Sequence, residues 1–264
     1  MGEWIGMPVV ASEHGGEIDR LIVYVHGIMF AALILWGAFF ILPLLRRRHY
    51  HSPAARHQGI RGWWPFVPVV VMATAELMLL IGISLPYWEE NVAAAPEIDD
   101  ETVVVRVIGQ QFQWNIHYPG ADGVFGRTDT ALVDDETNPI GLDLDDPNSA
   151  DDVTSLNVMY LPVDRPTVVY LSTKDVIHSF NLTELRVKQD AIPGMRIPIA
   201  FTPTLTNEAF GRQFEIACAQ LCGLGHYRMR GFLNVVSESE FDAWLTAELE
   251  RSQAERDADW LFEE

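Results

Sequence analysis

Two long apolar stretches near the N-terminus constrain this chain more than any other feature. Residues 21–45 carry no formal charge, and residues 63–85 carry only one charged side chain, Glu76. A bilayer core of about 30 Å requires roughly 20 residues of helix, and both stretches exceed that length. They are therefore predicted to form two transmembrane helices, joined as a hairpin.

The loop between these helices, residues 46–62, predicts the topology of the hairpin. It holds five arginines and no acidic residue, and short loops rich in arginine remain in the cytoplasm. Residues 1–20 carry acidic side chains ahead of Arg20, whereas a cleaved signal peptide begins with a basic region. We therefore expect a protein of the cytoplasmic membrane with both termini outside, residues 1–20 forming an extracytoplasmic segment and residues 86–264 an extracytoplasmic domain.

Acidic residues dominate the chain, with 37 Asp and Glu against 18 Lys and Arg and a formal net charge of −19. Nucleic acid is therefore not an expected partner, because its phosphates are also negative. The charge fits a basic protein partner attracted electrostatically, and it equally fits a surface solvated in high salt. Residues 129–152 are rich in Asp, Asn and Pro, which predicts an acidic loop, and Pro147 interrupts the spacing of a calcium-binding loop.

The sequence of the outer domain predicts β-structure. Between Glu101 and Val236, short runs of β-branched and aromatic residues alternate with turn residues, and no helical crossover separates them. This pattern predicts an all-β sandwich of Greek-key type. A C-terminal helix is predicted at about 238–255, because Ser237 and Glu240 have the spacing of a capping box.

The stretch CAQLCGLGHYRMRG, residues 218–231, contains several side chains that can bind a metal ion. It contains both cysteines of the chain, Cys218 and Cys222, followed by His226 and Met229. The simplest interpretation of two cysteines in an oxidising compartment is a disulfide. Thiolate, imidazole and thioether together favour copper, whereas zinc rarely takes methionine and haem attachment needs Cys-x-x-Cys-His.

Two thiolates three residues apart can bridge two copper ions, and a second histidine is then required. His178, in the stretch DVIHSF, lies at the end of a predicted strand upstream of the cysteines. A sandwich can bring two such loops to one end, so His178 is the candidate ligand. The alternative interpretation of His178 is a buried structural histidine.

The chain resembles subunit II of the haem-copper cytochrome c oxidases over nearly its whole length. The resemblance rests on the two-helix hairpin and, after it, on the stretches GQQFQWNIHYPG, DVIHSF, VKQDAIPGM and CAQLCGLGHYRM. The resemblance implies a cupredoxin-like Greek-key sandwich that holds a binuclear copper centre, CuA. It implies that Cys218 and Cys222 bridge both copper ions. The remaining ligands that it implies are His178, His226, the weakly bound Met229 and the backbone carbonyl of Gln220.

By this resemblance, the chain takes electrons from a soluble donor, such as cytochrome c or a blue copper protein. It passes them to haem in subunit I, where oxygen is reduced to water. Subunit I, subunit III and membrane lipid are the expected partners. The alternative is the CuA subunit of a haem-copper nitric oxide reductase. A membrane-anchored copper carrier and a disulfide-stapled binding module are further alternatives, and in both His178 would be dispensable.

Gln220 and Phe112 depart from the family pattern. Gln220 stands where many members have a glutamate that helps to bind magnesium at the boundary with subunit I. A neutral amide is a poorer ligand for this ion, which weakens the case for a magnesium site. Phe112 replaces a tryptophan that commonly receives the electron, so this role is shared between Phe112 and Trp114, with strand packing as the alternative.

Three acidic residues are further candidates. Asp175 and Asp190 lie in segments that match the family and are candidates for donor docking, the alternative being ordinary surface carboxylates. Glu76 is a candidate for a proton path or for pairing between helices, because a charge within lipid is costly. Arg61 occupies the position where the family often has a proton-accepting carboxylate ahead of its second helix.

Overall fold

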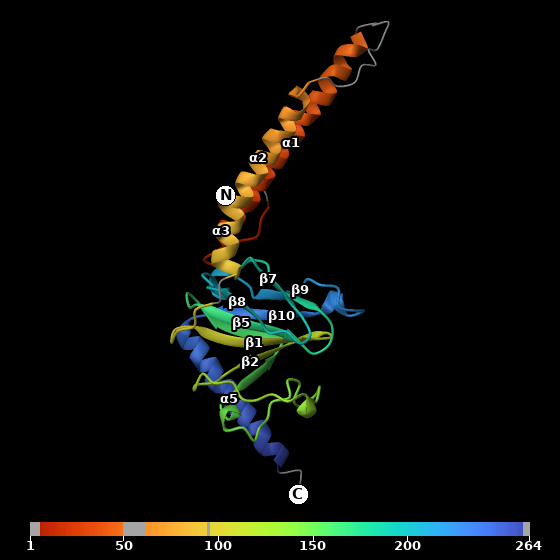
Figure 1. Ribbon diagram of the computed structural model, residues 1–264. Helices are drawn as coiled ribbons and strands as arrows, with labels where there is room; N and C mark the ends of the chain where they lie inside the picture. The colour runs from red at the N-terminus through yellow and green to blue at the C-terminus, as the bar shows by residue number, and fades with distance from the viewer. Residues whose placement is uncertain (1–5, 50–61, 94–95, 261–264) are drawn as a thin grey trace. The chain divides into compact units, whose positions relative to one another are not determined.

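The computed structural model describes residues 6–49, 62–93 and 96–260 (Figure 1). The chain divides into two compact units. One consists mainly of Glu17–Ala94, and the other combines Glu3–Gly16 with Ala95–Glu264.

Two apolar helical segments form the first unit. Helix α1 covers Gly15–His49. The second segment is continuous from Trp64 to Ala93 and consists of a 3-10 turn Trp64–Phe66, α2 Val67–Leu79, a wide π turn Leu80–Ser84, α3 Leu85–Trp88 and a second π turn Glu89–Ala93.

The wide turn lies just ahead of Pro86, whose ring nitrogen has no hydrogen to donate to the preceding turn. Both helical segments extend beyond the expected ranges 21–45 and 63–85. The most apolar stretch of each helical segment contains no buried residue, which fits a membrane protein with two helices. Most of the expected cytoplasmic loop 46–62, including Arg61, lies outside the described residues.

Residues 6–14 are built into the second unit and do not form a separate segment. Ala11 is fully buried in the core of the β-sandwich. Its N–H donates to the Glu184 carbonyl at 2.9 Å, and its carbonyl accepts from the Thr204 N–H at 2.9 Å. The Ser12 hydroxyl donates to the Leu185 carbonyl at 2.5 Å. This part of the expected segment 1–20 is therefore tied to the outer domain by its backbone.

Two five-stranded sheets face each other in the second unit, as the sequence predicts. Their strand orders are β3-β2-β1-β5-β8 and β4-β10-β9-β6-β7. Each sheet is mixed, because β1 pairs with β5 and β10 pairs with β4 in parallel, whereas the other pairs are antiparallel. The strands are β1 Val103–Gln110, β2 Gln113–Tyr118, β3 Val153–Leu156, β4 Val158–Pro162, β5 Thr167–Thr173, β6 His178–Leu182, β7 Val187–Ala191, β8 Ile197–Phe201, β9 Phe214–Cys218 and β10 Arg230–Val236.

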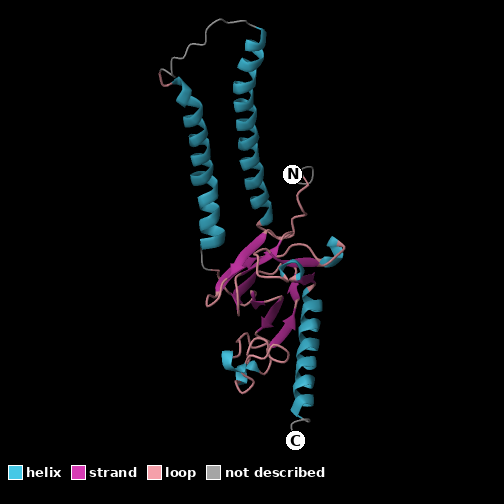
Figure 2. Cartoon of the chain, turned by 90° about the vertical axis from the view of Figure 1, so that its right-hand side faces the viewer, coloured by secondary structure: helices cyan, strands magenta, loops and turns pink. Residues whose placement is uncertain are grey.

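The C-terminal helix α5, Glu238–Trp260, lies beside the sandwich (Figure 2), and aromatic side chains attach it to the strands. Its first turn has the predicted capping box, in which the Ser237 N–H donates to Glu240 Oε2 at 3.0 Å. Trp244 stacks on Tyr160 with 4.4 Å between ring centroids. A short helix α4, Asn207–Phe210, precedes β9.

The acidic loop 129–152 is ordered by its own carboxylates. Asp129 accepts from the Ala131 N–H and Asp134 from the Thr137 N–H, each at 2.8 Å. Asp143 forms an ion pair with Arg127. Within the described ranges, the one group of His, Cys, Asp or Glu side chains placed closely enough to hold a metal ion lies elsewhere, at His178, Cys218 and Cys222.

Candidate metal centre

Strand pairing brings the two predicted ligand segments to the same end of one sheet. β6 begins at His178 and β9 ends at Cys218, and these strands are antiparallel neighbours with Phe180 opposite Cys218. The Ala219 N–H extends the ladder by donating to the Ser179 carbonyl at 2.9 Å. The loop from Cys218 to Met229 therefore begins beside His178.

The six predicted ligands converge on the two sulfur atoms. Cys218 Sγ and Cys222 Sγ lie 3.8 Å apart, and both cysteines are free. A disulfide bond is about 2.05 Å long. The other contacts to sulfur are His178 Nδ1 and the Gln220 carbonyl at 3.8 and 3.2 Å from Cys218, and His226 Nδ1 and Met229 Sδ at 3.5 and 3.7 Å from Cys222.

This donor set fits copper. Each sulfur has one imidazole nitrogen beside it, with a carbonyl near Cys218 and a thioether near Cys222. Soft thiolate and thioether donors favour copper over magnesium or calcium. His178, Cys222 and Met229 are buried, at 0%, 3% and 2% exposure, so water has little access to three of the six donors.

The two thiols differ in acidity. Burial raises the pKa of Cys218, but hydrogen bonds with His178 and with backbone groups outweigh it and lower that pKa to about 6. Burial and the neighbouring Cys218 raise the pKa of Cys222 to about 12. In the metal-free protein, Cys218 is therefore the thiolate near neutral pH, and metal binding at Cys222 must displace a proton.

Asp175 orients His178. The imidazole Nε2 donates to Asp175 Oδ1 at 2.8 Å, while Asp175 Oδ2 accepts from the Gln111 N–H at 2.7 Å. This carboxylate directs Nδ1 towards the sulfur of Cys218, an arrangement that fixes the ring of a metal-binding histidine. Burial raises the pKa of Asp175, and its bonds to His178 and to backbone N–H groups outweigh this and lower it.

Gln111, which the sequence did not single out, supports the loop. Its side-chain Nε2 donates to the Cys222 carbonyl at 2.6 Å. Phe112 lies against the same loop, since a Cβ atom added at Gly225 would be 2.6 Å from Phe112 Cγ. Gly223 has φ +131°, and an added Cβ would lie 2.7 Å from Gln111 Nε2. Only glycine allows the loop to lie this close to Gln111 and Phe112.

The remaining candidates lie in different environments. Trp114 is fully buried, edge-on to His178 with 6.0 Å between ring centroids, whereas Phe112 is partly exposed. Asp190 is partly exposed on β7, opposite Ser179. Gln220 is exposed, and its carbonyl faces Cys218. Glu76 lies on α2 in the other unit, and its carboxylate has no ion pair among the residues that the structure describes.

Three apolar side chains of the cysteine loop point into solvent. Leu221, Leu224 and Tyr227 are 77%, 97% and 85% exposed. We call them the loop patch. Large apolar groups this exposed around a functional cluster are typical of a protein-docking surface.

Comparison with known proteins identifies the family of this chain. The profile of the family described as cytochrome C oxidase subunit II, periplasmic domain, matches residues 103–236. An alternative cytochrome c oxidase subunit 2 from Bradyrhizobium diazoefficiens is 32% identical over 92% of this chain and 83% of its own length. Cytochrome c oxidase subunit 2 from Cereibacter sphaeroides is 30% identical over 69% of this chain and 58% of its own length. The crystal structure of the periplasmic domain of subunit II of cytochrome oxidase from Bradyrhizobium japonicum is 28% identical, with a TM-score of 0.42, and the match covers 60% of this chain and 99% of that domain. This chain belongs to the cytochrome c oxidase subunit II family.

Proposed function

We propose that this chain is the electron-accepting subunit of a terminal haem-copper oxidase and that it holds a binuclear copper centre. The observation that carries the proposal is the pair of sulfur atoms 3.8 Å apart, each flanked by an imidazole nitrogen. In the proposed site, Cys218 and Cys222 would hold the copper ions through their sulfur atoms, and His178 and His226 would each supply one nitrogen. Met229 and the Gln220 carbonyl would each supply one further donor.

The copper pair, when bound, accepts one electron and releases it to the next carrier. The contribution of the chain is to hold its donors still. His178 is fixed by Asp175, and the loop is fixed by Gln111 and Phe112. Ligands held on two supported loops of a sandwich keep nearly one geometry during electron transfer.

We propose distinct roles for the aromatic residues. Phe112 is partly exposed and touches the cysteine loop, so we assign it as the surface contact for the incoming electron. Trp114 packs behind His178 and is assigned to the core. The donor is a soluble protein such as cytochrome c or a blue copper protein. Asp190 remains a proposed donor contact, whereas Asp175 is proposed to position His178.

The outer domain also supports the proposed topology. Residues 6–14 hydrogen-bond to the same unit that contains residues 96–260. Both segments must therefore lie on the same side of the membrane, which requires an even number of crossings. Two apolar helices supply them, and we propose that both termini face away from the cytoplasm. Within the membrane, Glu76 then requires a partner from another subunit or a water-filled path.

Copper loading of the purified full-length chain in a non-ionic detergent tests this function. The expected product is purple, binds two copper ions per chain and has an electron paramagnetic resonance spectrum of one unpaired electron shared by two copper nuclei. His178→Ala should abolish this spectrum, and His26→Ala, in the membrane helix, should leave it intact. A colourless protein with at most one copper, or a His178→Ala variant with an unchanged spectrum, would refute the proposed centre. Oxygen and nitric oxide consumption by the intact complex then separates the oxidase from the reductase.

A further inference from the structure

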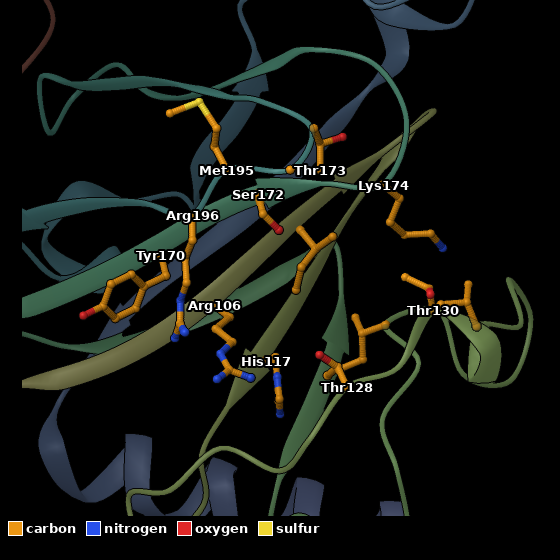
Figure 3. A pocket seen from close by; sticks show the side chains of 14 residues that line it. Arg106, His117, Thr128, Thr130, Tyr170, Ser172, Thr173, Lys174, Met195 and Arg196 are labelled. Carbon is orange, nitrogen blue, oxygen red and sulfur yellow. The ribbon is translucent and has the colours of Figure 1, made fainter.

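A pocket of about 630 Å³ lies on the outer face of the β3-β2-β1-β5-β8 sheet (Figure 3). On β1, Val105 and Val107 point into the core, so Arg106 between them points outwards. Arg106 is in register with His117 on β2 and with Tyr170 on β5. These three side chains therefore share one face of the sheet and line the pocket together.

Positive charge gathers in this pocket although the chain as a whole is strongly acidic. Arg106 and Arg196 both line it, and Figure 3 shows their guanidinium groups approaching one another. Neither guanidinium has a hydrogen bond or an ion pair with any residue of the described part of the chain. Lys174, at the other end of the pocket, is already paired with Asp135 at 2.7 Å. Asp152 attracts Arg106 electrostatically without a direct ion pair, so in a chain with 37 acidic residues the guanidinium groups of both arginines are available to an outside ligand.

Aromatic rings hold both guanidinium groups. The Arg106 guanidinium lies 3.9 Å from the centre of the Phe125 ring, and that of Arg196 lies 4.3 Å from the centre of the Tyr170 ring. Stacking fixes the guanidinium plane and leaves its N–H edge available for a planar or tetrahedral oxyanion. Burial and the charge of Arg196 outweigh the attraction of Asp152 and lower the pKa of Arg106 to about 10, so Arg106 remains charged at neutral pH.

Buried polar atoms around the pocket lack partners. Arg106 Nε is a buried donor without a hydrogen-bond partner within the described residues, whereas His117 Nδ1 and Asp152 Oδ1, also buried and without partners, are acceptors and do not donate to an anion. His117 is 0% exposed, and its Nε2 is held by Asp152 at 2.7 Å. Buried nitrogens of this kind are almost always satisfied in folded proteins. Hydroxyl groups of Ser172 and Thr128 also line the cavity and can donate to an anion.

We propose that this pocket binds a phosphate-class oxyanion, clamped between the guanidinium groups of Arg106 and Arg196. Two guanidinium groups match the double charge of phosphate and can each donate two hydrogen bonds to its oxygens. A carboxylate carries a single charge and would leave one arginine uncompensated. The pocket has the size that accommodates small organic ligands, so the phosphate can be free or part of a larger molecule such as a nucleotide.

Isothermal titration calorimetry tests this site on the full-length chain in non-ionic detergent and phosphate-free buffer at low salt. The probes are inorganic phosphate, adenosine monophosphate and acetate. We expect phosphate to bind and acetate not to bind, with Arg196→Gln weakening phosphate binding by about tenfold or more. Arg230→Gln is the matched control, because Arg230 is also exposed and lies over an aromatic ring, that of Phe232.

Each outcome decides the proposal. Tighter binding of adenosine monophosphate than of phosphate would assign the site to an organic phosphate, and equal affinities would assign it to the phosphate group alone. Absence of phosphate binding up to about 10 mM, binding of acetate as tight as that of phosphate, or equal loss in Arg196→Gln and Arg230→Gln would each overturn it. Arg196 is exposed, so its substitution should not unfold the protein, and the thermal unfolding temperature of each variant checks this. Because copper is not involved, failure here leaves the proposed copper centre unaffected.

Discussion

Replacement of Gly225 by alanine tests how the cysteine loop is held. The backbone of Gly225 has φ −92°, which any residue can adopt, so the expected effect is steric alone. The new Cβ atom would lie 2.6 Å from Phe112 Cγ and 2.7 Å from Cε2. An ordinary contact between such atoms is about 3.5–4.0 Å, so the ring or the loop must retreat by about 1 Å. Overpacking of this kind costs about 1–3 kcal/mol of unfolding free energy.

The assay is urea unfolding of the full-length chain in non-ionic detergent, followed by the fluorescence of tryptophan, including the buried Trp114. Gly225→Ala should lower the midpoint, and Leu224→Ala should not, because Leu224 is 97% exposed. The same clash should disturb the positions of Cys222 and His226, so copper affinity should fall in parallel with stability.

A double-mutant cycle provides the decisive comparison. In a Phe112→Ala background the ring is absent, and Gly225→Ala should then cost less than about 0.5 kcal/mol, giving a coupling of at least about 0.5 kcal/mol. If alanine at Gly225 destabilises both backgrounds equally, the contact with Phe112 is not the reason that glycine is required. The assigned role of Phe112 in supporting the loop would then be wrong.

Four further predictions concern separate parts of the chain. Asp175→Asn should lower copper affinity by about 10–100-fold, measured by competition with a chelator. The reason is that one amide oxygen cannot accept all the hydrogen bonds that the two carboxylate oxygens accept. An unchanged affinity would contradict the role of Asp175 in positioning His178. Met229→Leu should retain both copper ions but shift the reduction potential measured by redox titration, and loss of the metal would show that the thioether is a strong ligand. Trp244→Ala should lower the free energy of unfolding of the outer domain in urea by about 3 kcal/mol, because the ring stack on Tyr160 is lost, and helix α5 should detach first. An unchanged urea midpoint would show that this stack does not attach the helix. Burial lowers the pKa of His117 more than Asp152 raises it. Below about pH 6.5 the unfolded chain therefore binds more protons than the folded chain, and the free energy of unfolding should fall as the pH drops. His117→Gln should flatten this pH dependence, measured by urea titrations at several pH values.

Local patterns were sufficient to predict much of the fold. The two membrane helices follow from uninterrupted apolar stretches, since length and hydrophobicity alone decide whether a helix can span a bilayer. The sandwich follows from short β-branched runs without crossovers, and the start of α5 follows from Ser237 and Glu240. Each of these signals involves residues that are close together in the sequence.

The ligand set was predicted for the same reason. Cys218, Cys222, His226 and Met229 fall within one loop, and the chemistry of their side chains alone favours copper. His178 was predicted because two copper ions require a second histidine and His178 lies at the end of a predicted strand upstream of the cysteines. Strand order then explains how it reaches the cluster, because β6 and β9 are neighbours although about forty residues separate His178 from Cys218.

Other features depend on the tertiary structure. Asp175 looks like a surface carboxylate until the folded chain places its oxygen on His178, and Trp114 and Phe112 look alike until one is buried and the other is not. Residues 6–14 belong to the outer domain only because distant segments pair with them. Arg106 and Arg196 line one pocket for the same reason. The sequence by itself determined which residues bear the chemistry and which stretches can cross a membrane, because both depend on composition and local spacing. The tertiary structure decided which side chains touch, because contacts between distant segments depend on sheet order and register, which short-range patterns do not specify.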